Sequence, residues 1–590
     1  MVQMNTADAS GKTDLQPSGR GNDDKFTDAR RMRRTLREVF GIEHLRLGQK
    51  NVIRAVLAGR DALALMPTGA GKSLCYQLPA LYLPGMTVVI SPLISLMKDQ
   101  ADKLVQAGVP AVTLNSSLKR SEETEALRRI RDGDVKIVFV TPERFVKAEF
   151  IALCAYRRVG LIVVDEAHCV SEWGHDFRPD YLDLAQATET LGRPPLLALT
   201  ATATGDVVDD VLRHLKMRDP LVVNTGILRE NLHFSVRHVT DGREKALKIR
   251  ETLDFVSCHD GSGIIYAATV KEVERFYDAL KAANASVEKY HGKLSAKERI
   301  AAQDAFMANE CRIIVATNAF GMGIDKPDIR FVVHVQIPAS LEAYYQEAGR
   351  GGRDGGSAAC CLIFDFDDRR IQEFFLSRGH PGAALAIPLL GALGRLSAEN
   401  NRVAAVTEDE IRQAMPECSR AKVQTALKLL TDAGLVARDK QRRYRLISNE
   451  AGAPNPSAEA TKQVDATIAR YQEVIDRSRS ALEEMIRYAQ NAQCRWMKLL
   501  DYFQCDAPWT RCGTCDNCLR PVTAVSLLEV VEEKPEKEPR FSPGERVRMR
   551  RLGEGEIVDI AGDIANVTCA DGTVRQILLS YLKAASKTRA

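Results

Sequence analysis

The side chains best suited to chemistry lie in two short segments, at 66–73 and at 165–168. The first segment reads Met-Pro-Thr-Gly-Ala-Gly-Lys-Ser, and its small residues let backbone N–H groups close around phosphate oxygens. Lys72 is placed to reach the outer phosphates, and the Ser73 hydroxyl can bind Mg²⁺. We therefore expect a nucleoside triphosphate site, for ATP. The expected phosphate contacts are Thr68, Gly69, Gly71, Lys72 and Ser73.

The second segment, Asp-Glu-Ala-His, follows the apolar run 161–164, which is typical of a buried strand. At the end of such a strand Asp165 is suited to Mg²⁺ and Glu166 to polarising an attacking water. Two other interpretations are a glycine-rich loop that arises by chance and a pair of carboxylates that are simply exposed at a strand end. Because both segments occur in this order, triphosphate hydrolysis explains them better than either alternative.

Length and composition describe an ordinary globular protein of several domains. The chain has 590 residues, 45% of them hydrophobic and 27% charged, and a formal net charge of +4. That charge neither demands nor excludes nucleic acid, because a local basic groove is what matters. No apolar run reaches membrane-spanning length, and no secretory signal is recognisable. We expect no membrane association and a cytoplasmic protein, associated with the nucleoid if the organism is prokaryotic.

From about 36 to 375, apolar runs of strand length alternate with amphipathic helical stretches. This alternation predicts an α/β fold with two tandem parallel-sheet domains, at 26–225 and 226–375, after a disordered tail at 1–25. Strands are expected near 61–65, 87–90, 136–140, 196–199, 263–266, 312–316 and 331–334.

The remainder of the chain predicts smaller units. Residues 380–448 indicate two helices and a hairpin, and a linker is expected at 450–461. A helical module with cysteines at 462–521, a linker at 522–540 and a small β-barrel at 541–585 follow.

The segments of the α/β region together resemble a superfamily-two helicase, and within that class the RecQ family of DNA helicases. The matching segments are 91–100, 114–117, 141–144, 199–203, 290–292, 316–325 and 344–354. The resemblance implies two RecA-like motor domains, translocation 3′→5′ along single-stranded DNA, and unwinding of duplex DNA in recombination, repair and replication. Two alternatives remain: an RNA helicase, because Asp-Glu-Ala-His is shared, and a DNA-stimulated ATPase switch without unwinding.

The same resemblance assigns roles to further residues. Arg46 and Gln49 would hold the adenine of ATP. The segment 169–179 resembles the aromatic-rich loop that couples DNA binding to hydrolysis, and its side chains suit base stacking and phosphate contact. Packing of its aromatic residues in a core is the alternative. The expected DNA contacts are Trp173, His175, Phe177 and Arg178.

Two arginines of the last motor segment complete the expected active site. Arg350 and Arg353 lie three residues apart, on one face of a turn if the segment is helical. Facing the phosphates across the domain cleft, they would stabilise transition-state charge.

Four cysteines near the end of the helical module predict a structural metal site. Cys512, Cys515 and Cys518 form two short intervals, and Cys494 lies upstream. This spacing resembles the RecQ zinc module and implies Zn²⁺. Cys505 competes with Cys494 on spacing, and free thiols or an iron–sulfur cluster are the other readings.

The accessory segments offer two further predictions. Segment 380–448 resembles a winged helix whose wing carries basic residues, suited to duplex phosphates or to docking a protein. It precedes the zinc module, whereas in the RecQ family the winged helix follows it. The C-terminal segment resembles an SH3-like barrel that would bind a protein partner or DNA. The basic wing residues are Arg438, Lys440, Arg442, Arg443 and Arg445.

Overall fold

The computed structural model divides into two compact units, residues 1–519 and 520–590, each described by itself below. None of the helices in the part of the chain it describes is long and apolar enough to cross a membrane. It describes residues 22–171, 178–239, 244–321, 325–378, 383–399, 405–439, 443–447, 457–520, 541–549, 553–561, 564–569, 574–578 and 582–584.

The first lobe of the larger unit is built on a seven-stranded parallel sheet with the order β3-β4-β2-β5-β6-β1-β7. Successive residues of β2 face opposite sides, so Val88 and Ile90 join one apolar core and Val89 joins the other. Apolar cores on both faces require helices on both faces. The strands are β1 (Ala62–Leu65), β2 (Met86–Ile90), β3 (Ala111–Leu114), β4 (Ile137–Val140), β5 (Val159–Val164), β6 (Leu196–Thr200) and β7 (Leu221–Asn224).

The helices of this lobe connect the strands in the order expected of repeated strand–helix units. They are α1 (Asn22–Glu38), α2 (Gln49–Leu57), α3 (Leu74–Ala80), α4 (Ile94–Gln106), α5 (Arg120–Asp132), α6 (Pro142–Phe145), α7 (Ala148–Arg157), α8 (Leu184–Thr190) and α9 (Gly205–His214), with short 3₁₀ helices η1 (Ala167–Val170) and η2 (Pro179–Tyr181). Helix α1 begins inside the stretch predicted as a disordered tail, so that prediction is wrong for residues 22–25.

The second lobe has a six-stranded parallel sheet with the order β10-β11-β9-β12-β13-β8. Its strands are β8 (Leu232–His238), β9 (Ser262–Tyr266), β10 (Val287–Tyr290), β11 (Ile313–Ala316), β12 (Ile329–His334) and β13 (Ala358–Phe364). Its helices are α10 (Glu244–Ser257), α11 (Val270–Ala282), α12 (Ala296–Met307), α13 (Leu341–Ala348) and η3 (Phe366–Asp368). The two parallel sheets confirm the predicted α/β architecture.

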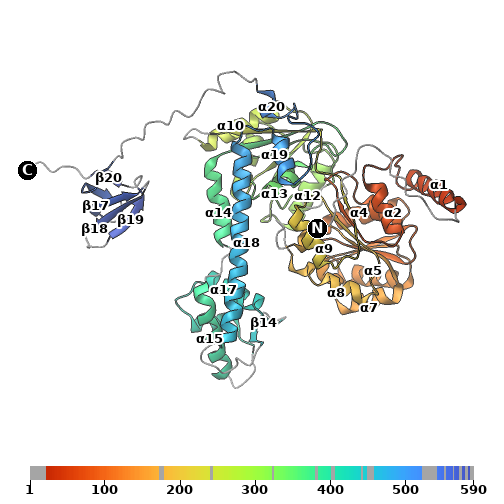
Figure 1. Ribbon diagram of the computed structural model, residues 1–590, viewed down its shortest axis with the longest axis horizontal. Coiled ribbons are helices and arrows are strands. Elements are labelled where there is room, and N and C mark those ends of the chain that lie inside the picture. Colours follow the sequence, from red (N-terminus) through yellow and green to blue (C-terminus); the bar gives the residue numbers. More distant parts are fainter. Residues whose placement is uncertain are drawn as a thin grey trace, which may run out of the picture. The chain divides into compact units, whose positions relative to one another are not determined.

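A long helix, α18 (Ala458–Gln490), links two apolar cores. Near its start Ala460 and Val464 pack with the segment between α14 and α18, and near its end Leu482 and Met485 pack with the second lobe. Figure 1 shows α15 and α17 around one end of α18 and α14 beside the other. The predicted linker at 450–461 is wrong for its last four residues, which are helical because Ser457 caps the Ala460 N–H.

Between α14 (Arg369–Arg378) and α18 lie the two predicted helices, the predicted hairpin and one helix that was not predicted, α15. They are α15 (Ala383–Glu399), α16 (Glu408–Ala414), α17 (Arg420–Asp432), β14 (Val436–Arg438) and β15 (Tyr444–Leu446). After α18 come α19 (Arg495–Tyr502) and α20 (Asp516–Leu519).

The smaller unit is an antiparallel sheet with the order β19-β18-β17-β16-β20. Val547, Ile557 and Val567 are buried in it. Its strands are β16 (Arg546–Met549), β17 (Gly553–Ala561), β18 (Ile564–Cys569), β19 (Val574–Leu578) and β20 (Leu582–Ala584). Five short antiparallel strands agree with a small β-domain, and its resemblance to an SH3-like barrel stays a prediction.

Candidate active site and metal centre

A cavity of about 610 Å³ lies between the two lobes and collects most of the predicted ATP-site residues. Both lobes contribute, so the cavity is complete only when they stand together. Its predicted lining residues are Arg46, Gln49, Thr68, Gly69, Gly71, Lys72, Ser73, Asp165, Glu166, Arg350 and Arg353.

The glycine-rich loop joins β1 to α3 and forms one wall of this cavity. Gly69 and Gly71 have φ angles of 81° and 79°, in the left-handed region that favours glycine. A Cβ atom at Gly71 would lie 2.8 Å from Nε2 of Gln49, which leaves no room for a side chain. Lys72 Nζ donates to the Met66 carbonyl at 3.1 Å, and burial lowers the pKa of Lys72.

Gln49 braces this loop from α2. Its side-chain amide donates to the carbonyls of Ala70 (3.1 Å) and Gly71 (2.9 Å), and its Oε1 accepts from the Arg46 N–H at 2.8 Å. The Arg46 guanidinium in turn donates to the Gly69 carbonyl. Both residues border the cavity, and their contact with adenine stays a prediction.

The two carboxylates lie where β5 ends, as the sequence predicts. Burial and the adjacent Glu166 raise the pKa of Asp165 to about 7, and Lys72 partly offsets this. Glu166 has φ 49°, a strained left-handed conformation that redirects the chain at this point. Its Oε2 is buried and makes no hydrogen bond within the described residues. An accumulation of negative charge with an unsatisfied oxygen suits a divalent cation.

His168 connects the acidic segment to the end of β6. The Thr200 hydroxyl donates to the Thr202 carbonyl at 3.0 Å, so it accepts from His168 Nδ1, which lies 3.0 Å away. Glu166 Oε2 is 3.5 Å from the same nitrogen. The His168 side chain therefore connects residues 200–202 to Glu166, so a movement at 200–202 would also shift this carboxylate.

The second lobe presents its two arginines to the cavity from a turn that follows α13. Arg350 is only 6% exposed, and its Nε has no hydrogen-bond partner among the described residues. Arg353 Nη1 pairs with Asp325 Oδ1 at 2.9 Å. The segment is not helical, because α13 ends at Ala348, and the turn that follows brings both side chains to the cavity.

Contacts between the lobes surround the arginines. The Thr68 hydroxyl donates to the Gly349 carbonyl at 3.0 Å, and Arg229 donates to the same carbonyl at 2.7 Å. Lys103 on α4 pairs with Asp325 at 2.9 Å. Sequence reasoning missed Arg229 and Lys103, because each acts on a residue more than 100 positions away and no local spacing marks it.

The predicted DNA-contact loop is described only at its two ends, since Trp173, His175 and Phe177 lie outside the described residues. Before the loop, the Ser171 hydroxyl donates to Asp210 on α9 at 2.7 Å. After it, the Arg178 N–H donates to the Cys169 carbonyl at 2.9 Å. Both ends are therefore fixed to the first lobe beside the acidic segment.

The four predicted metal ligands converge. All four sulfurs lie within 4.8 Å of one another, with Cys494 and Cys515 4.0 Å apart and Cys512 and Cys518 3.9 Å apart. Tetrahedral zinc with Zn–S bonds of about 2.3 Å places sulfurs about 3.8 Å apart. An iron–sulfur cluster would spread them over several irons and hence farther apart. Cys505 is not a member of the group.

The surroundings of the sulfurs suit thiolates. Backbone N–H groups of Cys512 and Arg495 donate to Cys494 (3.3 Å) and Cys515 (3.4 Å). Burial raises the pKa of Cys515, which disfavours a thiolate without a cation. At Cys518 burial is outweighed by donated hydrogen bonds, including one from the Gly513 N–H, and the pKa falls to about 7. The donor set and its spacing fit Zn²⁺.

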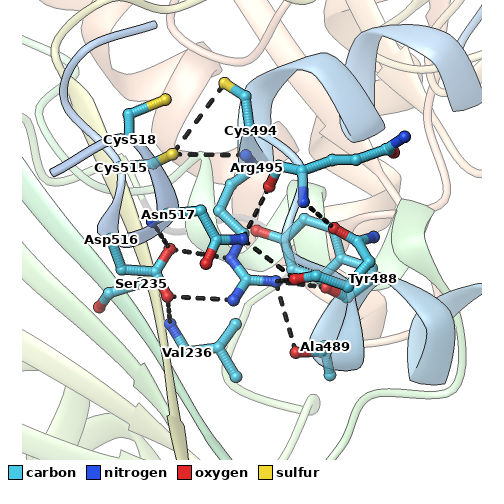
Figure 2. Close-up of polar contacts among 12 residues, drawn as sticks. Ser235, Val236, Tyr488, Ala489, Cys494, Arg495, Cys515, Asp516, Asn517 and Cys518 are labelled. Carbon is cyan, nitrogen blue, oxygen red and sulfur yellow. Dashed lines mark hydrogen bonds and ion pairs between the residues drawn. The ribbon is translucent and has the colours of Figure 1, made fainter. Parts of the chain in front are cut away.

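A buried ion pair attaches this metal site to the second lobe (Figure 2). Arg495, 1% exposed, pairs with both oxygens of Asp516 at 2.9 and 3.0 Å. Asp516 also accepts from the Val236 N–H on the edge strand β8, at 3.0 Å. Burial alone would raise the pKa of Asp516, but the hydrogen bonds from Arg495 lower it. Trp496 adds a hydrogen bond to the Leu232 carbonyl at 3.1 Å.

Family models match three parts of the chain. "DEAD/DEAH box helicase" matches residues 46–211, "Helicase conserved C-terminal domain" matches 244–355, and "RecQ zinc-binding" matches 437–519. The first two cover all of the predicted cavity-lining residues of the two lobes, and the third covers the four cysteines. Two parallel-sheet lobes with this cavity define a helicase of superfamily two.

Curated relatives narrow the class. "ATP-dependent DNA helicase RecQ" of Bacillus subtilis (strain 168) is 45% identical over 345 residues, which is 58% of this chain and 58% of that protein. "Probable ATP-dependent DNA helicase RecS" of the same organism is 40% identical over 58% of this chain and 68% of that protein. "ATP-dependent DNA helicase RecQ" of Pasteurella multocida (strain Pm70) is 42% identical over 56% of this chain and 51% of that protein. The chain belongs to the RecQ family, and its match spans between half and three-fifths of the two RecQ relatives.

Proposed function

We propose that this protein is an ATP-dependent DNA helicase that moves 3′→5′ on single-stranded DNA and unwinds duplex DNA in recombination, repair and replication. The observation that carries the proposal is the cavity shared by a phosphate loop and carboxylates on one lobe and two arginines on the other. Such a site is complete only in the closed arrangement, so nucleotide binding and release drive lobe movement. DNA as substrate, the direction and the pathways rest on family membership.

A role in hydrolysis is proposed for each of these residues. Backbone N–H groups of the loop and Lys72 hold the phosphates, and Glu166 orients the attacking water. Ser73 and Asp165 would hold Mg²⁺, which supplies positive charge to the phosphate oxygens. Arg350 and Arg353 stabilise the charge that develops in the transition state. All of these side chains border the same cavity.

Adenine recognition is proposed for Gln49 and Arg46. Both amide hydrogens of Gln49 are already used by the phosphate loop, so its Oε1, with a second lone pair, is the group left for the adenine amino group. Base binding would then adjust the loop directly, because the same amide braces it.

DNA coupling is proposed for the loop that begins after Ser171. Trp173 and Phe177 would stack on bases, and His175 and Arg178 would contact the backbone. The anchored ends of the loop support this role, because they lie next to the acidic segment and α9. A Trp173→Ala protein should lose more DNA stimulation of its ATPase than basal hydrolysis.

The remaining modules receive supporting roles. Zn²⁺ at the four cysteines would be structural, since the four sulfurs leave no coordination position open. The segment between α14 and α18 is proposed as a winged helix for duplex DNA. The smaller unit is proposed as an SH3-like barrel for a protein partner.

Strand displacement with matched DNA and RNA duplexes that carry 3′ or 5′ tails tests the proposal. We expect ATP-dependent displacement of 3′-tailed DNA, absent in Lys72→Ala and Glu166→Gln, with DNA binding retained in both variants. Displacement of RNA alone would contradict the proposal, and ATP hydrolysis stimulated by DNA without displacement would show a switch instead of a helicase.

A further inference from the structure

Helix α1 displays a stripe of arginines that the motor does not use. Arg30, Arg33, Arg34 and Arg37 follow the spacing i, i+3, i+4, i+7, which places four side chains on one face of a helix. All four residues are exposed. They do not border the nucleotide cavity.

The opposite face of α1 fixes this stripe in place. Met32 and Leu36 pack into an apolar cluster with residues of α2 and α3, and Leu36 is 3% exposed. The Thr35 hydroxyl lies 2.7 Å from the Tyr82 hydroxyl, within hydrogen-bond distance. The helix is therefore docked on the first lobe, and the arginine face points to solvent.

Little negative charge balances the stripe. Between residues 30 and 38 there are five arginines and one glutamate, and that glutamate, Glu38, pairs with Arg34 at 2.8 Å. Arg31 lies over the Tyr82 ring at 5.4 Å. Among the side chains that the structure describes, no carboxylate pairs with Arg30, Arg33 or Arg37; the side chains of 22–29, which include three aspartates, are not among them. Like charges at i, i+3 and i, i+4 destabilise a helix, and a bound polyanion removes that repulsion.

Helix α2 carries further exposed cations. Lys50 and Arg54 are exposed on it, and α2 carries no acidic residue. The two helices share one apolar cluster, and both carry exposed cations on this part of the first lobe.

We propose that the arginine stripe of α1 is a second DNA-binding surface, outside the motor segments, that holds backbone phosphates. The inference rests on the proposed function for DNA as substrate. Guanidinium groups bind phosphates with two parallel hydrogen bonds. Arg30 and Arg37 lie about 10 Å apart along the helix axis at 1.5 Å per residue. Duplex DNA carries a charge every 1.7 Å or so of its axis, so several phosphates face such a stripe.

The test replaces Arg30, Arg33 and Arg37 together with glutamine, which keeps the helix and its apolar face. Affinity for a single-stranded oligonucleotide and for a blunt duplex is measured at several salt concentrations. We expect roughly tenfold weaker binding at 0.1 M salt to one or both DNAs, and a salt slope smaller by about two to three. Basal ATP hydrolysis should stay unchanged, because none of the three residues borders the cavity.

Two matched variants isolate the cause. Glutamine at Arg131, Lys216 and Lys281, three exposed cations on separate elements, removes the same total charge and should change binding little. Lysine at the three α1 positions keeps the charge and should keep most of the affinity. Equal binding by the α1 glutamine variant and this control, for both DNAs, would overturn the proposal. Failure of the unmodified protein to unwind DNA would instead overturn the proposed function.

Discussion

At the scale of single residues, the proposed catalysis depends on charge brought to one cavity from both lobes. Lys72 on the first lobe and Arg350 and Arg353 on the second surround the space where the phosphates are proposed to lie. Burial lowers the pKa of Lys72 and Arg353, which indicates a poorly hydrated site. Electrostatic interactions with phosphate are stronger in such a site than in water.

Arg350→Ala should lower kcat for ATP hydrolysis by about 10³-fold, a typical loss for an arginine finger. ATP affinity should change only several-fold, because the loop on the first lobe still holds the phosphates. Single-turnover hydrolysis and binding of a fluorescent ATP analogue separate the two effects. Arg330→Ala is the control, since Arg330 pairs with Asp354 outside the cavity. Turnover near that of the control would contradict the role of Arg350.

At the scale of elements, lobe closure involves α4 of the first lobe and the segment before β12 of the second. Lys103 on α4 pairs with both Asp99 and Asp325 at 2.9 Å, and Asp325 pairs with Arg353. Burial alone would raise the pKa of Asp325, but hydrogen bonds from Lys103 and Arg353 lower it. This chain of ion pairs crosses from one lobe to the other and ends at Arg353, for which a catalytic role is proposed.

Lys103→Ala should therefore weaken closure and raise KM for ATP about two- to fivefold with little change in kcat, as expected when a partly exposed pair worth up to about 1 kcal/mol is lost. The difference should shrink at high salt, which screens the pair in the unmodified protein. Lys216→Ala serves as the control because Lys216 pairs with Glu189 within the first lobe. A fall in kcat at constant KM would argue against an effect on closure.

The attachment of α19 and α20 to β8 provides a second prediction at this scale. Arg495→Ala leaves Asp516 buried without its partner and should lower the free energy of unfolding by about 3 kcal/mol or more. Thermal and urea unfolding measure the loss. Arg487→Ala removes an exposed pair with Glu484 in the same module and should cost less than about 1 kcal/mol. Equal effects of the two substitutions would contradict the buried attachment.

At the scale of the whole molecule, the metal module and the second lobe share one hydrophobic core. Tyr344 and Tyr345 on α13 contact Tyr488 and Trp496 of the module through their rings. Helix α13 leads directly to Arg350, so the module supports the element that precedes the two arginines proposed to act in catalysis. Loss of the metal should therefore also disturb the position of Arg350 and Arg353 in the nucleotide site.

Removal of zinc by a chelator, or Cys515→Ser, should release about one metal ion per chain, lower the unfolding temperature and reduce ATP turnover. Metal analysis and calorimetry give the first two quantities. Cys505→Ser should keep the metal, because Cys505 is not among the four clustered sulfurs. Unchanged stability after complete loss of metal would contradict a structural role.

Most of the fold and of the nucleotide site follows from local sequence. Apolar runs of strand length predicted eight of the thirteen strands of the two sheets, and the spacing of the loop and carboxylates predicted one wall of the cavity. The cysteine spacing predicted the metal group, and the structure favours Cys494 over Cys505 because only Cys494 lies with the other three sulfurs.

What the sequence determined by itself is the chemistry that each segment can perform, because neighbouring residues fix strand ends, phosphate loops and ligand intervals. Tertiary structure alone decided which distant groups meet: Thr68 with Gly349, Lys103 with Asp325, and Asp516 with Val236. It also placed Arg350 in a turn instead of a helix. Such pairings depend on how lobes and modules pack, and packing joins positions that no local period relates.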